Sequence, residues 1–206
     1  QSFDTTLEYA NKVGADIILN SDPDGDRIGV MVKHGRGWHY INGNEIGVIL
    51  THYVIKRRKE GSGGPGIVVK TDVTTNLITK ICEANGVEVI GGLLVGFKYV
   101  GDVMNRLERE GRIGELLLAC EESHGFVGGN YIREKDAVVP AIWLSELSAT
   151  LKKKGETLLD YLEEIYSQYG YFRNYLTEIR LPGAEGMSQI KKIQDGLRKG
   201  KPKKFG

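Results

Sequence analysis

The sequence predicts an α/β fold made of layered α/β domains with mixed sheets. Two observations support this prediction. Short apolar runs rich in β-branched residues, which are typical of buried strands, recur along the 206 residues. Longer amphipathic stretches with helix-starting and helix-ending residues lie between them. Strands and helices therefore alternate, and part of the strand pairing is expected to be parallel.

The elements follow in order from these patterns. A first helix precedes two apolar strands on either side of an acidic loop, and a third strand contains Trp38. Glu45 lies where the second helix opens, and Asp136 is the expected N-cap of a long helix. The expected helices are residues 5–13, 46–59, 74–84, 98–110, 136–153, 157–169 and 187–198, and the expected strands are residues 15–19, 28–32, 38–41, 67–71, 87–90, 115–119 and 176–180.

Composition excludes several classes of partner. A net charge of +1 gives no basis for bulk binding to nucleic acid, and no apolar run approaches the ~20 residues of a membrane span. We therefore expect no nucleic-acid and no membrane partner. Cys82 and Cys120 lack metal-site spacing, which predicts buried free thiols in a reducing, cytoplasmic compartment. The chain begins with Gln1 rather than Met, which favours a fragment or a processed chain.

The most informative segment is the acidic loop at residues 22–27. Asp22, Asp24 and Asp26 alternate, so in an extended or tightly turned segment their side chains project to the same side, and Pro23 and Gly25 let a short loop wrap around an ion. Three converging carboxylates repel one another unless a hard divalent cation neutralises them. They leave about half of an octahedral shell open, which favours Mg²⁺ over Ca²⁺. Arg27 follows with a planar fork suited to phosphate.

Glycine-containing and acidic segments also admit other interpretations. Asp-Gly between apolar runs predicts a plain hairpin turn, and this alternative stays open. An EF-hand is rejected because Arg27 and Lys33 occupy the loop positions that require Gly and Glu. Residues 61–66 match G-x-G-x-x-G, but they follow a helix and precede a strand, which is the wrong order for a dinucleotide site.

Three later segments also carry polar groups at expected strand or helix ends. Residues 91–98 precede a helix, where backbone amides can meet an anion, but Phe97-Lys98 stands where a P-loop requires Lys-Ser/Thr. Residues 121–125 end a strand, where ligands of α/β sheets gather. Residues 133–136 offer cations for a phosphate. Taken singly, the first segment is equally well explained as a glycine-rich turn and the second as a solvated loop. The third, taken alone, would be interpreted as a charged surface turn.

Together and in this order, the segments resemble the α-D-phosphohexomutases, the phosphoglucomutase and phosphomannomutase superfamily. The resemblance spans residues 5–198. The magnesium loop, the Gly-Phe-Lys loop, the sugar-reading Glu-x-Ser motif and the Arg-x-Lys-Asp segment of that family are similar to residues 22–27, 96–98, 121–123 and 133–136. The resemblance implies Mg²⁺ as cofactor on Asp22, Asp24 and Asp26, and it implies substrate binding by Gly96, Lys98, Glu121, Ser123, Arg133 and Lys135.

The departures from the family pattern define which part of a mutase this chain resembles. The first-domain phosphoserine loop and the fourth-domain Arg-x-Ser-Gly-Thr phosphate loop are both absent from the sequence. The resemblance therefore implies an α/β fragment truncated at both ends. Residues 1–43 would be the end of domain 2, residues 44–170 domain 3, and residues 171–206 the connection towards domain 4. Domains 1 and 4 of the same protein would be its partners.

The implied activity is the interconversion of a sugar 1-phosphate and 6-phosphate, with glucose or mannose as the sugar or a pentose 1-/5-phosphate pair. The phosphoserine and the general acid/base would come from the missing first domain, with Arg27 in support, so the fragment alone is expected to be inactive. Two alternatives stay open. One is a metal-dependent phosphatase or phosphotransferase that uses the acidic loop with its own nucleophile, which labelling of Asp22 by a phosphate donor would support. The other is a non-catalytic sugar-phosphate-binding module.

Overall fold

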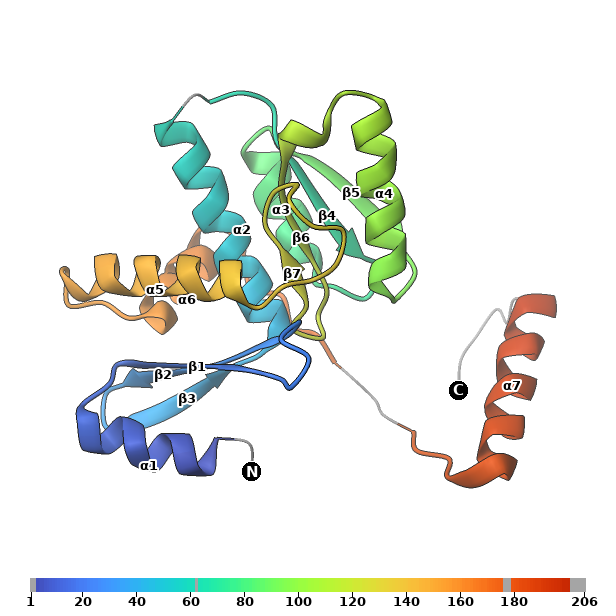
Figure 1. The fold of residues 1–206 in the computed structure, drawn as a ribbon, viewed down its shortest axis with the longest axis horizontal. Helices are drawn as coiled ribbons and strands as arrows, with labels where there is room; N and C mark the ends of the chain where they lie inside the picture. Colours follow the sequence, from blue (N-terminus) through green and yellow to red (C-terminus); the bar gives the residue numbers. More distant parts are fainter. Residues whose placement is uncertain (1–2, 62, 176–178, 201–206) are drawn as a thin grey trace. The chain divides into compact units, whose positions relative to one another are not determined.

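The computed structural model describes residues 3–61, 63–175 and 179–200 of the chain (Figure 1). The chain divides after Phe172 into two compact units. In the first unit, helices pack on two separate sheets. The predicted α/β class with mixed sheets is confirmed.

An antiparallel sheet opens the first unit. Its strands lie in the order β1-β2-β3, and helix α1 contacts β1. Ser21 pairs with Ile28, so residues 22–27 form the connection of a β1–β2 hairpin. The hairpin interpretation of the Asp-Gly loop is therefore correct as a description of the local structure. The elements are α1 (Asp4–Val13), β1 (Ile17–Ser21), β2 (Ile28–His34) and β3 (Gly37–Ile41).

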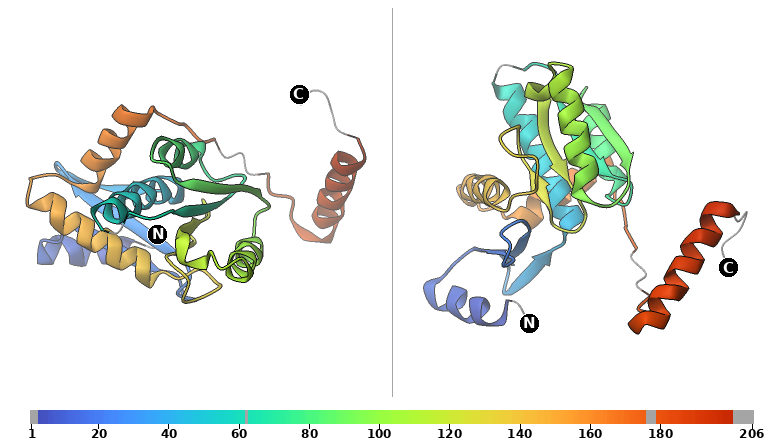
Figure 2. Two further views of the ribbon diagram at one scale, coloured as in Figure 1. Left: turned by 90° about the horizontal axis from the view of Figure 1, so that it is seen from above. Right: turned by 45° about the vertical axis from the view of Figure 1, so that its right-hand side comes forward.

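The second sheet has helices on both faces, as the views from above and from the side show (Figure 2). Its order is β5-β4-β6-β7, in which β4 pairs in parallel with β5 and β6, and β7 is antiparallel. Val68 of the fully buried β4 packs with α2 and α3, whereas Ile67 and Val69 pack with α4. The elements are α2 (Gly43–Glu60), β4 (Ile67–Thr71), α3 (Asn76–Ala84), β5 (Glu88–Leu93), α4 (Phe97–Arg109), a 3₁₀ turn (Ile113–Glu115), β6 (Leu116–Cys120) and β7 (Phe126–Val127).

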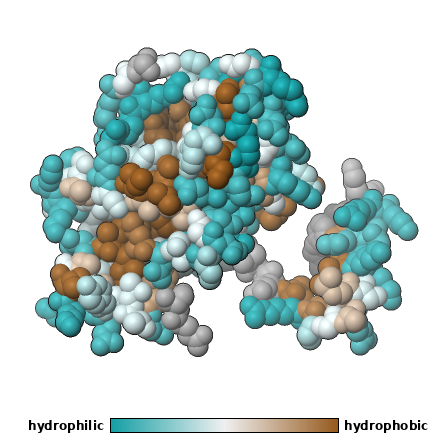
Figure 3. Space-filling model, viewed as in Figure 1, coloured by the Kyte–Doolittle hydropathy of each residue, from teal (hydrophilic) through white to brown (hydrophobic). Residues whose placement is uncertain are grey.

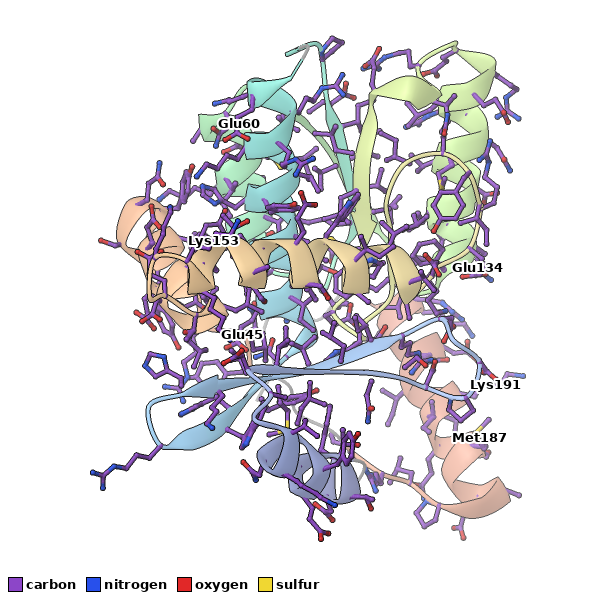
Figure 4. All side chains as sticks on the ribbon, turned by 60° about the vertical axis from the view of Figure 1, so that its left-hand side comes forward. Glu45, Glu60, Glu134, Lys153, Met187 and Lys191 are labelled. Carbon is purple, nitrogen blue, oxygen red and sulfur yellow. The ribbon has the colours of Figure 1, made fainter. Side chains whose placement is uncertain are left out.

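Helices α5 (Val138–Lys152) and α6 (Leu158–Tyr169) connect the two sheets into one unit. α5 contacts both β1 and β7, and α6 contacts β2 and α2, so β2 and the helices share one hydrophobic core. Figure 4 labels Glu134 just before α5 and Lys153 just after it. Hydrophobic side chains gather on the surface near α5 (Figure 3), where Val138 and Ile142 are more than half exposed.

Local sequence signals explain where several helices begin. Asn42 and Glu45 form a reciprocal capping box at the start of α2, and Thr157 and Asp160 form another at the start of α6. The carboxylate of Asp136 accepts hydrogen bonds from the backbone N–H groups of Val138 and Val139, as expected of an N-cap. These bonds satisfy amides that have no partner within the helix.

Apart from the expected strand at 176–180, the predicted elements are present with shifts of a few residues at their ends, and β7 and the 3₁₀ turn were not predicted. The second unit contains α7 (Gly183–Lys199), which begins four residues before its expected start. Residues 179–180 of the expected strand at 176–180 are not in a strand, and its other residues lie outside the described part. Cys82 and Cys120 are buried free thiols, as predicted. Within the described ranges, every helix is too short or too polar to cross a bilayer.

Candidate functional site

The acidic loop at residues 22–27 is organised by one of its own carboxylates. Oδ1 of Asp22 accepts hydrogen bonds from the backbone N–H groups of Asp26 and Arg27, both at 3.2 Å. Gly25 takes a left-handed φ of 71°, which favours glycine, and its N–H donates to the carbonyl of Asp22 at 3.0 Å. Desolvation raises the pKa of Asp22, but hydrogen bonds from Arg27 and Asp26 and the positive charge of Arg27 together outweigh it and hold that pKa below its ordinary value.

Asp26 is the member of the loop that faces other segments of the chain. Its Oδ2 lies 3.1 Å from Nζ of Lys135, and its side chain is 23% exposed. Its other oxygen, Oδ1, is buried and has no hydrogen-bond partner among the described residues. A buried carboxylate oxygen without a hydrogen bond is costly unless a cation satisfies it. This atom therefore fits a hard cation such as Mg²⁺.

The three predicted ligands are not equivalent in the structure. Asp22 and Asp26 both lie within about 4 Å of Nε of Arg27. Asp24 is exposed, and its side chain makes no hydrogen bond or ion pair within the described residues. The described part of the chain accordingly contains no ready group of three acidic, His or Cys side chains that would hold a metal. The donor chemistry suits Mg²⁺, and a third carboxylate requires Asp24 to turn inward.

The predicted sugar-reading loop, residues 121–125 and called the sugar loop below, lies next to this site. Glu121 is 4% exposed, and its Oε1 accepts a hydrogen bond from the backbone N–H of Gly96 at 3.0 Å. The predicted residues Gly96 and Glu121 are thus in contact. Ser123 is partly exposed, and no bond of its hydroxyl occurs within the described residues. Its hydroxyl is available to a ligand.

Lys135 joins the two loops. Besides its ion pair with Asp26, its ammonium lies 5.7 Å from the ring centroid of Phe97. A Cβ on Gly125 would lie 2.5 Å from Cδ of Lys135 and 3.4 Å from Oε2 of Glu121, so only glycine allows this approach. Desolvation lowers the pKa of Lys135, but the Asp26 carboxylate outweighs it, and the pKa is raised.

Two other predicted cations are not brought to this cluster. Lys98 is exposed in the first turn of α4, with Nζ over the ring of Tyr99 at 5.0 Å. Arg133 instead pairs with Glu108 of α4 at 2.8 Å. Both lie on or beside α4, so they surround the site rather than form its centre.

Two polar residues near the site were missed by the sequence patterns. Lys70 is 4% exposed and donates to the carbonyl of Thr74 at 2.8 Å, and burial lowers its pKa. The signal that marks it is a lysine inside an otherwise apolar strand. His124 bonds to Ile28 and Tyr40, which belong to the other sheet. A histidine in a loop has no pattern that reveals such contacts.

The comparison with protein families decides what this arrangement belongs to. The family model described as phosphoglucomutase/phosphomannomutase, alpha/beta/alpha domain III, matches residues 42–169. The chain belongs to the phosphoglucomutase/phosphomannomutase family.

Relatives of known sequence and structure agree with this assignment. A phosphoglucomutase of Staphylococcus aureus (strain MSSA476) is 32% identical over 206 residues, which is all of this chain and 36% of the relative. A putative phosphomannomutase from Thermus thermophilus superposes with a TM-score of 0.62 at 24% identity over 82% of this chain and 34% of that one. The pp63/parafusin phosphoglucomutase from Paramecium gives 0.60 at 18% identity over 90% and 30%. These two structures share the fold.

The family match divides the site in two. The matched segment includes Glu121, Ser123 and Lys135, whereas the acidic loop precedes residue 42. The phosphoglucomutase/phosphomannomutase domain III therefore supplies one side of the junction between the loops. The antiparallel sheet supplies the other side. The chain spans about a third of the length of the curated relatives it matches.

Proposed function

We propose that this chain is the metal- and sugar-binding part of a phosphohexomutase. The complete enzyme would interconvert the 1-phosphate and 6-phosphate of glucose or mannose, or the 1- and 5-phosphates of a pentose, through a phosphoserine and a bisphosphorylated sugar. The observation that carries the proposal is the Asp26–Lys135 ion pair, because it brings the acidic loop against the loop that ends at Gly125.

The proposal assigns residues 1–43 to the end of domain 2, residues 44–170 to domain 3 and residues 171–206 to a connection towards domain 4. Domains 1 and 4 of the same protein would be its partners, and domain 1 would supply the phosphoserine and the general acid/base. The exposed apolar side chains of Val138 and Ile142 support contact with a further part of the protein. The free buried thiols support a cytoplasmic location.

Asp22, Asp24 and Asp26 would hold Mg²⁺, with Oδ1 of Asp26 as the oxygen that lacks a hydrogen-bond partner. When bound, the ion would stabilise negative charge that develops on a transferred phosphoryl group. Arg27 would orient the phosphoserine segment through its exposed guanidinium. Asp22 already uses one oxygen to hold the loop, so it would contribute its other oxygen.

Glu121 and Ser123 would bind sugar hydroxyls. Oε1 of Glu121 is engaged by the Gly96 amide, which fixes the carboxylate and leaves Oε2 for a ligand. Lys135 would add a positive charge beside the sugar loop, while Lys98 and Arg133 would meet a phosphate from the side of α4. Phosphoryl-transfer enzymes act mainly by such positioning and charge stabilisation.

Isothermal titration of the 206-residue chain with MgCl₂ and with glucose 6-phosphate tests the proposal. Asp26→Asn should abolish Mg²⁺ binding, whereas Asp102→Asn, an exposed carboxylate on α4, should leave it unchanged. The chain alone should show no turnover of glucose 1-phosphate to glucose 6-phosphate. Turnover by the chain alone, or equal Mg²⁺ affinity in both variants, would contradict the assignment.

A further inference from the structure

His124 holds a backbone conformation that its residue type disfavours. Its φ is 71°, and it is the one non-glycine residue with positive φ among the described residues. Side chains with a Cβ rarely adopt this conformation, because the Cβ comes close to a backbone carbonyl. Such a residue persists where surrounding interactions determine it. Its neighbours should therefore show what the conformation serves.

Those neighbours belong to the other sheet. The backbone N–H of Ile28 donates to the carbonyl of His124 at 3.2 Å, and Nδ1 of His124 lies 2.9 Å from the carbonyl of Ile28. A carbonyl only accepts, so Nδ1 must carry the proton. Nε2 is then the acceptor of the neutral ring, and it accepts a hydrogen bond from the hydroxyl of Tyr40 at 2.8 Å. His124 thus bonds to the backbone of Ile28, the first residue of β2, and to the side chain of Tyr40 in β3.

These contacts lie between the two functional loops. Ile28 follows the acidic loop directly, and His124 follows Ser123 within the sugar loop. An isolated bridge between Arg27 and Gly125 continues the same contact. In this conformation the ring of His124 contacts β2 and β3, whereas its chain neighbours Ser123 and Gly125 belong to the sugar loop.

We propose that His124, together with Tyr40, is a positioning residue that sets the distance between the acidic loop and the sugar loop. The proposal rests on the proposed function for the role of the loops. The residue touches neither metal nor sugar in this assignment. It acts by fixing Ser123 and Glu121 relative to Asp26, and the contacts of His124 with Ile28 and Tyr40 are called the clasp below.

Tyr40→Phe tests the clasp with the least disturbance, because it removes one hydroxyl and leaves the ring contact with Phe3. Amide hydrogen exchange by NMR on the 206-residue chain should show Ile28 N–H exchanging roughly two- to tenfold faster, the effect of one hydrogen bond. The amide of Val68 in the buried β4 should not change. Tyr9→Phe, at an exposed tyrosine, is the matched control.

Two substitutions of His124 separate its backbone role from its side-chain role. His124→Gly accepts the left-handed φ, so it should raise exchange at Ile28 only if the ring matters. His124→Asn tolerates the same φ and can donate to the Ile28 carbonyl, so it should restore part of the protection. In the wild-type chain, ¹⁵N shifts of the ring should show a protonated Nδ1 and an unprotonated Nε2.

Affinity for glucose 6-phosphate connects the clasp to the proposed function. Tyr40→Phe and His124→Gly should weaken it several-fold at unchanged Val68 protection. Unchanged exchange at Ile28 in both variants would overturn the clasp. Altered exchange with unchanged affinity would overturn its positioning role. If the wild-type chain binds no sugar phosphate, the proposed function fails. The clasp is then tested by itself through the NMR chemical shifts of the Asp26 and Ser123 amides, which should change in Tyr40→Phe.

Discussion

Gly43, the first residue of α2, should tolerate no side chain, although alanine ordinarily favours a helix. A Cβ built there would lie 2.8 Å from the carbonyl carbon of Glu122 and 2.9 Å from the backbone nitrogen of His124, and closer still to the Glu122 oxygen. Real Cβ atoms essentially never approach below 3.0 Å, and these atoms are backbone, so a side chain cannot swing away. The sugar loop would have to shift away from α2.

The expected cost follows from overpacking, which is about 1–3 kcal/mol, less at most ~1 kcal/mol gained from alanine in a helix. Urea unfolding should therefore show Gly43→Ala less stable than wild type. Gly114→Ala is the control, because its Cβ would meet nothing within 4 Å. Since Glu121 and Ser123 lie on the displaced loop, glucose 6-phosphate affinity should also fall. A Gly43→Ala chain as stable as Gly114→Ala would refute this reasoning.

Three further predictions concern the site and its supports. Lys135→Met should destabilise the chain by about 1–3 kcal/mol in urea, because it leaves Oδ2 of the partly buried Asp26 without its cation and only the more distant Arg27 near the carboxylate. Since the raised pKa of Lys135 means that the folded state binds the proton more tightly, this contribution is present below the unfolded-state pKa of ~10.4 and is lost as pH rises through the raised folded-state pKa. If the free energy of unfolding of Lys135→Met fell at alkaline pH as steeply as that of wild type, this reasoning would be wrong. Thr157→Ala should lower the melting temperature by removing a capping box worth ~1 kcal/mol, and Thr157→Ser should retain most of it. MgCl₂ should raise the melting temperature of wild type but not of Asp26→Asn, and a shift in both would exclude the loop as the binding site.

Much of the fold was predictable because its signals are local. Apolar runs with β-branched residues mark β1, β2 and β4, and the cap residues mark the helix starts. The pairing of β7 with β6 was not predictable, since a two-residue strand has no periodicity. The short 3₁₀ turn before β6 gave no signal either.

The candidate site was predictable in its residue types and only partly in its geometry. The alternation of Asp22, Asp24 and Asp26 predicts convergence in an extended or tightly turned segment. The loop is turned at Gly25, as its glycine allows, and Asp24 is exposed in this turn. The partner of Asp26 is Lys135, which lies far along the chain and meets it in a region where α5 contacts β1.

The charges of the junction connect metal binding to phosphate binding. Five carboxylates belong to the two loops, and that of Glu122 accepts hydrogen bonds from the neutral hydroxyls of Thr71 and Thr74. Arg27 and Lys135 are the cations paired with these loops, so an excess of negative charge remains where a phosphorylated sugar is proposed to bind. A phosphate dianion would be repelled by that excess.

One divalent cation lowers this excess by two charges. The cations of Lys98 and Arg133 beside α4 can then attract the phosphate against a weaker opposing field from the acidic loop. The order of binding follows from the same count: the sugar phosphate should bind more tightly after Mg²⁺ than before it. The proposed need for magnesium thus rests on the charge count of the site as well as on its ligand chemistry.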